Sequence, residues 1–170
     1  MTNMIPRTGI KRTRQAIGFL LAWASLAGVA VAQEITVQIE SNPPVHVSAA
    51  DLAGMPHQNV PVEMHAKAIT FEAVPLRLVL EKAGVTFGES IRGKRLASYL
   101  LVECADGYRV VFALPELDPA FADRGIFLAD RADGQPLDSK EGPYRLVIPA
   151  EKRMARWARQ VTTIEVVQIP

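Results

Sequence analysis

The sequence predicts an α+β domain with a mixed or antiparallel β-sheet and short helices. Three observations lead to this class. Segments with the composition of strands outnumber helical ones, several of them are separated by short turns, and the helical signals are few and short. A doubly wound fold, in which strands and long helices alternate, is therefore not expected.

The first 32 residues have the pattern of a removable export signal. A basic stretch precedes an apolar run over residues 16–31, which ends in the cleavage pattern Ala30-Val31-Ala32. The basic residues of the stretch are Arg7, Lys11, Arg12 and Arg14. This run is shorter than the roughly 20 residues that span a bilayer, and no Arg-Arg pair is present. We expect Sec-type export, cleavage after Ala32, and a periplasmic or secreted product.

Residues 33–170 are expected to form a single domain of 138 residues. They contain 15 basic and 18 acidic residues, a net charge of −3, whereas the whole chain has +1. A nucleic-acid-binding domain would be basic, so this class is excluded. No second long apolar run occurs, so no membrane contact is expected after cleavage.

The N-terminal part of the domain is predicted to hold two strands and a short helix. Residues 35–39 alternate apolar and polar side chains, as a half-buried strand does. Ser48 and Asp51 have the spacing of a capping box, which begins a helix that ends near Gly54. Residues 60–66 form a second predicted strand.

The clearest helix signal covers residues 74–84. Pro75 suits the first helical position, and Gly84 suits the position just after the last turn. Four apolar residues recur with helical spacing and define one buried face. They are Leu76, Val79, Leu80 and Ala83.

A β-hairpin follows, with strands over residues 99–103 and 108–113 and Asp106-Gly107 in the turn. The next predicted elements are a short helix or turn over 115–117, strands over 126–129 and 144–148, and a turn at Asp133-Gly134.

The C-terminal part is predicted to hold a helix over residues 151–160 and a strand over 162–169. On a helix, Lys152, Arg156 and Arg159 would share one side and Met154 and Trp157 the other.

Four short blocks occur in order downstream of residue 70. They are Phe71 to Leu76, Ala105 to Tyr108, Leu128-Ala129 with Asp133 to Leu137, and Gly142 to Pro149. Together with Ala155-Arg156-Trp157 and Ile164 to Val166, these blocks resemble the molybdopterin-binding domain of the sulfite oxidase family. The resemblance implies a mixed α/β domain that holds a pyranopterin with molybdenum and catalyses oxygen-atom transfer. It also implies a protein thiolate on the metal.

The chain departs from the family at the position of that thiolate. The matching stretch, residues 55–67, contains no Cys, and the single cysteine, Cys104, lies beside the hairpin turn. Only 38 residues, 33–70, precede Phe71 after cleavage, whereas the larger members have a longer N-terminal half. The family's glycine after the matched proline is also absent, since Ala150 follows Pro149. We therefore expect no catalytic residue and no metal ligand, and Cys104 is expected to be a small buried side chain.

Six residues are candidates for contacts to an anion or a pterin. They are Arg145, Lys152, Arg153, Arg156, Asp106 and Tyr108. Arginine side chains present donors that match phosphate or carboxylate. The alternative is that the cations form a solvated helix face and that Asp106 and Tyr108 only shape a hairpin turn. Arg145, on an apolar strand, would need a partner such as Asp106 or Glu116. His46, His57 and His65 lack the spacing of a metal site.

The favoured hypothesis is an exported, non-catalytic binding or accessory module without a cofactor. Its partner would be a periplasmic protein or a small anionic ligand. Two alternatives stay open: a molybdopterin-dependent oxidoreductase, and a periplasmic binder of a small anionic ligand.

Overall fold

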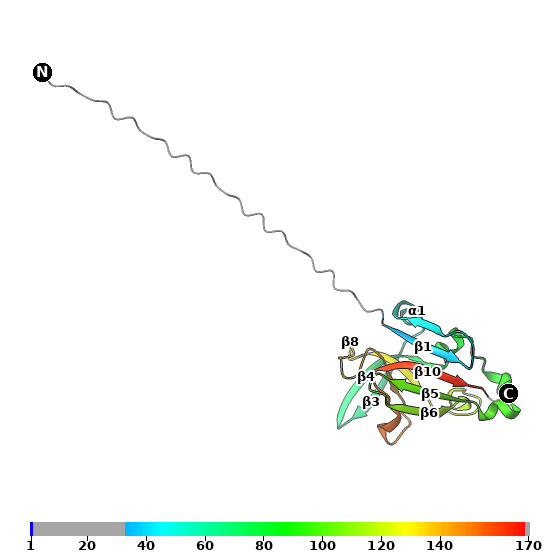
Figure 1. The fold of residues 1–170 in the computed structure, drawn as a ribbon. Coiled ribbons are helices and arrows are strands. Elements are labelled where there is room, and N and C mark those ends of the chain that lie inside the picture. The colour runs from blue at the N-terminus through cyan, green and yellow to red at the C-terminus, as the bar shows by residue number, and fades with distance from the viewer. Residues whose placement is uncertain (2–32, 169–170) are drawn as a thin grey trace. The chain divides into compact units, whose positions relative to one another are not determined.

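The computed structural model describes Met1 and residues 33–168. The predicted export signal, apart from Met1, and the end of the predicted last strand lie outside the described residues. Within residues 33–168 the chain forms two five-stranded sheets with few, short helices, which confirms the α+β class (Figure 1).

The first sheet has the strand order β2-β1-β10-β5-β6. Its strands are β1 (Glu34–Ile39), β2 (Val45–Ser48), β5 (Tyr99–Cys104), β6 (Arg109–Ala113) and β10 (Val161–Val167). β1 and β10 pair in parallel and all other neighbours pair antiparallel, so the sheet is mixed. The strands nearest the two ends of the domain thus lie side by side (Figure 1).

The second sheet has the order β3-β4-β7-β8, and β9 also pairs with β7. Its strands are β3 (Gln58–Met64), β4 (Lys67–Pro75), β7 (Phe127–Ala132), β8 (Gln135–Pro136) and β9 (Arg145–Val147). All of these pairings are antiparallel. β3 is an edge strand of this sheet, and β6 is an edge strand of the first.

The helices are short and connect the strands. They are α1 (Ala49–Ala53), α2 (Leu76–Lys82) and the 3₁₀ turns η1 (Gly88–Ser90), η2 (Gly93–Ala97), η3 (Leu114–Leu117) and η4 (Met154–Arg156). Side chains from both sheets and from α2 form one buried apolar core, in which Phe71, Phe112 and Leu80 are among the large members.

The two N-terminal helix predictions are confirmed. The Ser48 hydroxyl accepts from the Asp51 N–H at 3.1 Å, and the Asp51 carboxylate accepts from the Ser48 N–H at 3.1 Å, so the capping box forms. In α2, Leu76, Val79 and Leu80 are buried as the periodicity predicts. Gly84 follows the helix with φ of +101°, a conformation that glycine adopts without strain.

The predicted helix over residues 151–160 is wrong. Only the single turn η4 is helical. The backbone after η4 forms hydrogen bonds with the segment around β9, and it therefore does not continue a helix. Ala158 accepts from the Leu146 N–H at 2.7 Å, and the Val161 N–H donates to Tyr144 at 2.9 Å. The basic residues of this segment therefore do not share one helix face.

The longest strand, β4, has no counterpart among the predicted elements. A register shift lies between Glu72 and Ala73 where β4 pairs with β7, and the neighbours Ala73 and Val74 are both buried. This irregularity removes the alternation of period two by which a strand is recognised in a sequence.

Candidate functional site

The candidate residues gather around η4 and the β5–β6 hairpin, but they do not share one cavity. Arg145 and Arg156 lie in separate ion-pair networks. Asp106 and Tyr108 line one cavity, and Lys152 lines another. Arg153 is exposed on the loop before η4.

Arg145 is a buried cation on β9, with 4% of its surface exposed. Its guanidinium lies 5.0 Å from the ring centre of Phe71 and 5.8 Å from that of Trp157, and it pairs with Glu141. The expected partners Asp106 and Glu116 are thus wrong. Burial, and after it the charge of Arg159, lowers the pKa of Arg145 to about 10. Arg145 therefore makes its contacts within the interior of the domain.

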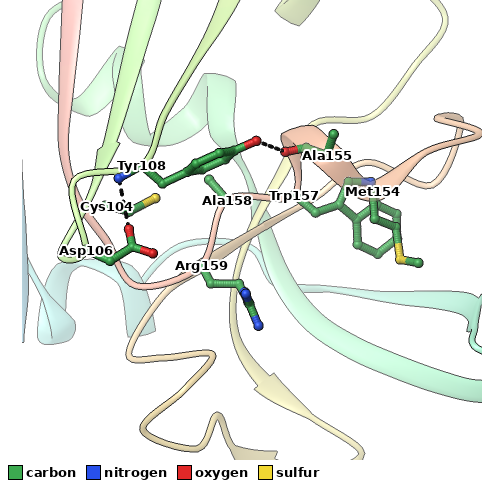
Figure 2. Close-up of a pocket in the computed structure, with 8 residues that line it drawn as sticks. All are labelled: Cys104, Asp106, Tyr108, Met154, Ala155, Trp157, Ala158 and Arg159. Carbon is green, nitrogen blue, oxygen red and sulfur yellow. Dashed lines mark hydrogen bonds between the residues drawn. The ribbon is translucent and has the colours of Figure 1, made fainter.

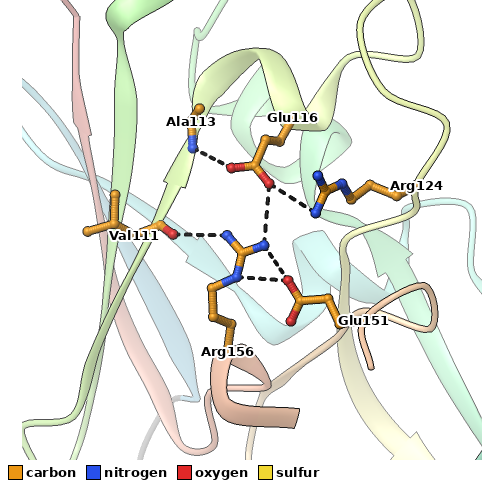
Figure 3. A network of polar contacts seen from close by, with 6 residues as sticks. All are labelled: Val111, Ala113, Glu116, Arg124, Glu151 and Arg156. Carbon is orange, nitrogen blue, oxygen red and sulfur yellow. Dashed lines mark hydrogen bonds and ion pairs between the residues drawn. The ribbon is translucent and has the colours of Figure 1, made fainter. Parts of the chain in front are cut away.

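Arg156 is the centre of a polar network that ties η4 to β6 and η3 (Figure 3). Its Nε donates to Glu151 at 2.8 Å, its Nη2 lies 3.4 Å from Glu116, and its Nη1 donates to the carbonyl of Val111 at 3.2 Å. The guanidinium also lies 4.4 Å from the ring centre of Phe112. Burial alone would lower the pKa of Arg156, but the hydrogen bonds to Glu151 and Glu116 outweigh it and raise the pKa.

The same network covers part of the exposed edge of β6. Glu116 accepts from the Ala113 N–H at 3.0 Å and pairs with Arg124 at 3.3 Å (Figure 3). Together, Arg156 and Glu116 occupy a backbone carbonyl and a backbone N–H of this edge strand. Unpaired edge groups attract other strands, so this cover disfavours edge-to-edge pairing.

Asp106 and Tyr108 line a cavity of about 270 Å³ between the hairpin turn and η4 (Figure 2). Asp106 accepts from the Tyr108 N–H at 2.9 Å, and the Tyr108 hydroxyl donates to the carbonyl of Ala155 at 2.8 Å. The hydroxyl thereby fixes the hairpin to η4. That these two residues contact an anion or a pterin stays a prediction.

Cys104 and Arg159 line the same cavity (Figure 2). Cys104 is 3% exposed, which confirms it as a small buried side chain, and burial followed by the charge of Asp106 raises its pKa to about 11. Arg159 lies 3.4 Å from Glu141 and is more than half exposed. It was not among the predicted candidates, although the expected helix over 151–160 placed it on the same side as Lys152 and Arg156.

None of the three histidines of residues 33–168 lines either cavity beside η4. His46 lies 3.2 Å from Glu34, and His57 lies 3.6 Å from Asp130. Across residues 33–168, no three side chains of His, Cys, Asp or Glu form a group that could hold a metal ion. In the same part of the chain, no helix has the length and apolar character needed to cross a bilayer.

A family model described as the oxidoreductase molybdopterin binding domain matches residues 27–170. The chain belongs to this family. A search of curated proteins gives no significant match. Among solved structures, the domain is similar to the sulfane dehydrogenase SoxCD from Paracoccus pantotrophus, with a TM-score of 0.61 and 18% identity over 79% of this chain. This similarity shows the fold, and it covers 38% of the SoxCD chain.

The residues of this family member do not fit a molybdenum–pterin group. The stretch where the family's thiolate is expected forms β3 and its turn and has no cysteine, and the Cys104 thiol is buried with a raised pKa. Arg145 and Arg156 are held by internal carboxylates, and Lys152 lies at a different cavity. The described residues therefore bring neither a metal-ligating thiolate nor a convergent phosphate site together.

Proposed function

We propose that the chain is an exported, non-catalytic binding or accessory module that keeps the family's fold without its molybdenum chemistry. The observation that carries the proposal is the position of the single cysteine. Cys104 is buried at the end of β5, on an element other than the one matched to the family's thiolate. Without an accessible thiolate, the metal lacks the soft ligand that anchors it to the protein.

The arrangement of the cations supports the same proposal. A phosphate group is held by several donors that converge on it. Here Arg145 contacts Glu141, Arg156 contacts Glu151 and Glu116, and Arg159 contacts Glu141. These arginines link parts of the fold, and the glutamates of the domain largely balance their charges.

The proposal includes export through the segment 1–32 and removal of that segment. The short apolar run and the cleavage pattern at Ala32 support it. Mass spectrometry of the protein from periplasmic extract measures the site of cleavage directly. We expect an N-terminus at Gln33, and an intact leader would contradict this part of the proposal.

The decisive experiment is the analysis of molybdenum and pterin in protein purified from its native periplasm. We expect far less than one molybdenum per chain and no pterin after oxidation and chromatography. A molybdoenzyme purified from the same extract serves as the control that the cofactor survives the procedure. Stoichiometric molybdenum together with pterin would overturn the proposal.

The family match over residues 27–170 favours one alternative, a molybdopterin-dependent oxidoreductase. In that case Cys104 is the only side-chain thiol that could reach a metal. A dye-linked reductase assay on the native protein and on a Cys104→Ala variant tests this alternative. Turnover that is lost in the variant supports it, and absence of turnover in the native protein removes it.

A further inference from the structure

A cavity of about 290 Å³ lies beside the start of β1, where the proposed cleavage creates the N-terminus of the mature chain. Gln33 lines this cavity together with Asp130 of β7 and Tyr144 of the loop before β9. Apart from Arg131, the other lining residues are apolar. Among the described residues, Asp130 is the only acidic one in the lining. The cavity therefore brings one carboxylate to the first residue of the predicted mature protein.

Two hydrogen bonds hold Gln33 at this cavity. The backbone carbonyl of Gln33 accepts from the Tyr144 hydroxyl at 3.2 Å and from the Ala49 N–H at 3.0 Å. Tyr144 is 3% exposed, so its hydroxyl is fixed within the domain. The backbone nitrogen of Gln33 is joined to the same carbonyl through a single Cα atom, and it is therefore held at the cavity as well.

The carboxylate of Asp130 has no close partner. Within residues 33–168 no hydrogen bond reaches its Oδ1 atom, and the Nε2 atom of His57 lies 3.6 Å from it. The Asp130 side chain is 30% exposed, so the carboxylate is accessible from the cavity. Burial, and after it the charge of Asp130, raises the pKa of Tyr144, so this charge acts at the hydroxyl that holds Gln33. A carboxylate that is partly removed from water is stabilised by a cation placed beside it.

The other charged groups near Gln33 leave Asp130 as its nearest available anion. Arg131 lines the cavity as well, but this residue is exposed, so water and salt screen its charge. Glu34, the neighbour of Gln33 in the chain, faces His46 of the adjacent strand β2 at 3.2 Å.

We propose that this cavity is a binding site for the α-ammonium group that forms on Gln33 when the leader is removed. The ammonium pairs with the carboxylate of Asp130. In the precursor the same nitrogen is an uncharged amide, so the processed protein gains an ion pair that the precursor cannot form. This pair fixes the start of β1, the strand that joins β2 to β10. The inference rests on the proposed function, because it requires export and cleavage after Ala32.

The test measures the reactivity of the Gln33 α-amine in protein purified from the periplasm. Acetic anhydride acylates the unprotonated amine, and an ion pair keeps the amine protonated. At pH 7, the rate of acylation of the N-terminus, followed by mass spectrometry, is expected to be about two- to fivefold lower in the native protein than in an Asp130→Asn variant. The matched control is Asp123→Asn, which removes an exposed carboxylate outside the cavity and is expected to leave the native rate unchanged. A free peptide with the sequence of residues 33–39 is expected to react as fast as the Asp130→Asn variant.

Thermal unfolding gives a second measurement of the same ion pair. Brief acylation at pH 7 modifies the α-amine before the lysines, because lysine side chains have a higher pKa. Loss of the α-ammonium charge is expected to lower the melting temperature of the native protein by about 2–4 °C. In the Asp130→Asn variant the same modification is expected to lower it by less than about 1 °C. Each protein is compared with its own unmodified form, so the effect of the substitution itself on folding cancels.

Three results would overturn the inference alone: equal acylation rates in the native protein and the peptide, equal losses of melting temperature in the native protein and the Asp130→Asn variant, or a native N-terminus that has lost ammonia. The last result would mean that the free amine had attacked the side-chain amide of Gln33 and closed a lactam, which carries no charge. An intact leader would overturn both the export part of the proposed function and this inference. Molybdenum with pterin in the native protein would overturn the non-catalytic part of the proposed function and leave the inference standing.

Discussion

Replacement of Arg156 by alanine tests whether this arginine is a structural cation. The substitution removes the hydrogen bond to Glu151, the contact with Glu116 and the hydrogen bond to the carbonyl of Val111. It also removes the contact with the ring of Phe112. Glu151, whose side chain is 12% exposed, then keeps its charge without a partner.

The expected loss of stability follows from these contacts. A hydrogen bond to a charged group contributes about 1.5–3 kcal/mol, and a cation–π contact about 0.5–1 kcal/mol. The Arg156 side chain is 31% exposed, so water replaces part of what is lost. We expect Arg156→Ala to lower the free energy of unfolding by about 2–3 kcal/mol. For a domain of this size the melting temperature should fall by about 6–9 °C.

Urea unfolding followed by circular dichroism measures the loss. Arg153→Ala is the matched control, because Arg153 precedes the same turn but is exposed and has no ion pair with a described residue. The control should change the free energy of unfolding by less than about 0.5 kcal/mol. If both variants were equally stable, the network in Figure 3 would not hold η4 to the sheet, and the structural role of Arg156 would be refuted.

Three further predictions concern buried or capped groups. Glu141→Gln should lower the free energy of unfolding by up to about 3 kcal/mol, because it leaves the Arg145 cation without its anion. Adding a second substitution, Arg145→Met, should restore much of this loss of stability, as measured in the same urea assay. Hydrogen bonds from Ser48 and Lys82 lower the pKa of Asp51 to about 2. The ionised Asp51 therefore stabilises the fold above about pH 4, and this stabilisation is lost as the pH falls toward 2. In an Asp51→Asn variant, the free energy of unfolding should change less between pH 4 and pH 2. Burial raises the pKa of Cys104 from 9.0 to about 11, so the unfolded thiol ionises first and the free energy of unfolding should fall as the pH rises from 9 to 11. Cys104→Ala should remove this contribution to the fall in stability between pH 9 and 11. If the free energy of unfolding of the variant fell as steeply with pH, the buried thiol would not be its cause.

Local signals in the sequence predicted much of the fold. The alternation of apolar and polar side chains over residues 35–39 predicted β1, and the capping box at Ser48 and Asp51 predicted α1. Asp106-Gly107 gave the turn between β5 and β6, where Gly107 has φ of +82°. Each of these signals acts between residues that are close in sequence, so a single chain is enough to reveal it.

The candidate site could not be predicted in the same way, because its contacts join distant segments. Arg156 meets Glu116 across 40 residues, and the Tyr108 hydroxyl meets Ala155 across 47. Residues 151–160 do have the apolar spacing of a helix, but their backbone forms hydrogen bonds with the segment around β9 instead of helical ones. Arg145 pairs with Glu141, four residues earlier on the turn before β9, whereas Asp106 or Glu116 was the expected partner. Tertiary contacts therefore decide the role of each basic residue.

The parallel pairing of β1 with β10 has a consequence for how the domain is made. Until β10 has been synthesised, the β1–β2 pair has no bonded neighbour, and the β5–β6 hairpin stands alone. Pairing of segments so far apart in sequence slows folding, since a long loop must close first. A nascent chain that lacks β10 therefore cannot complete its first sheet, because β10 is the strand that joins β1 to β5.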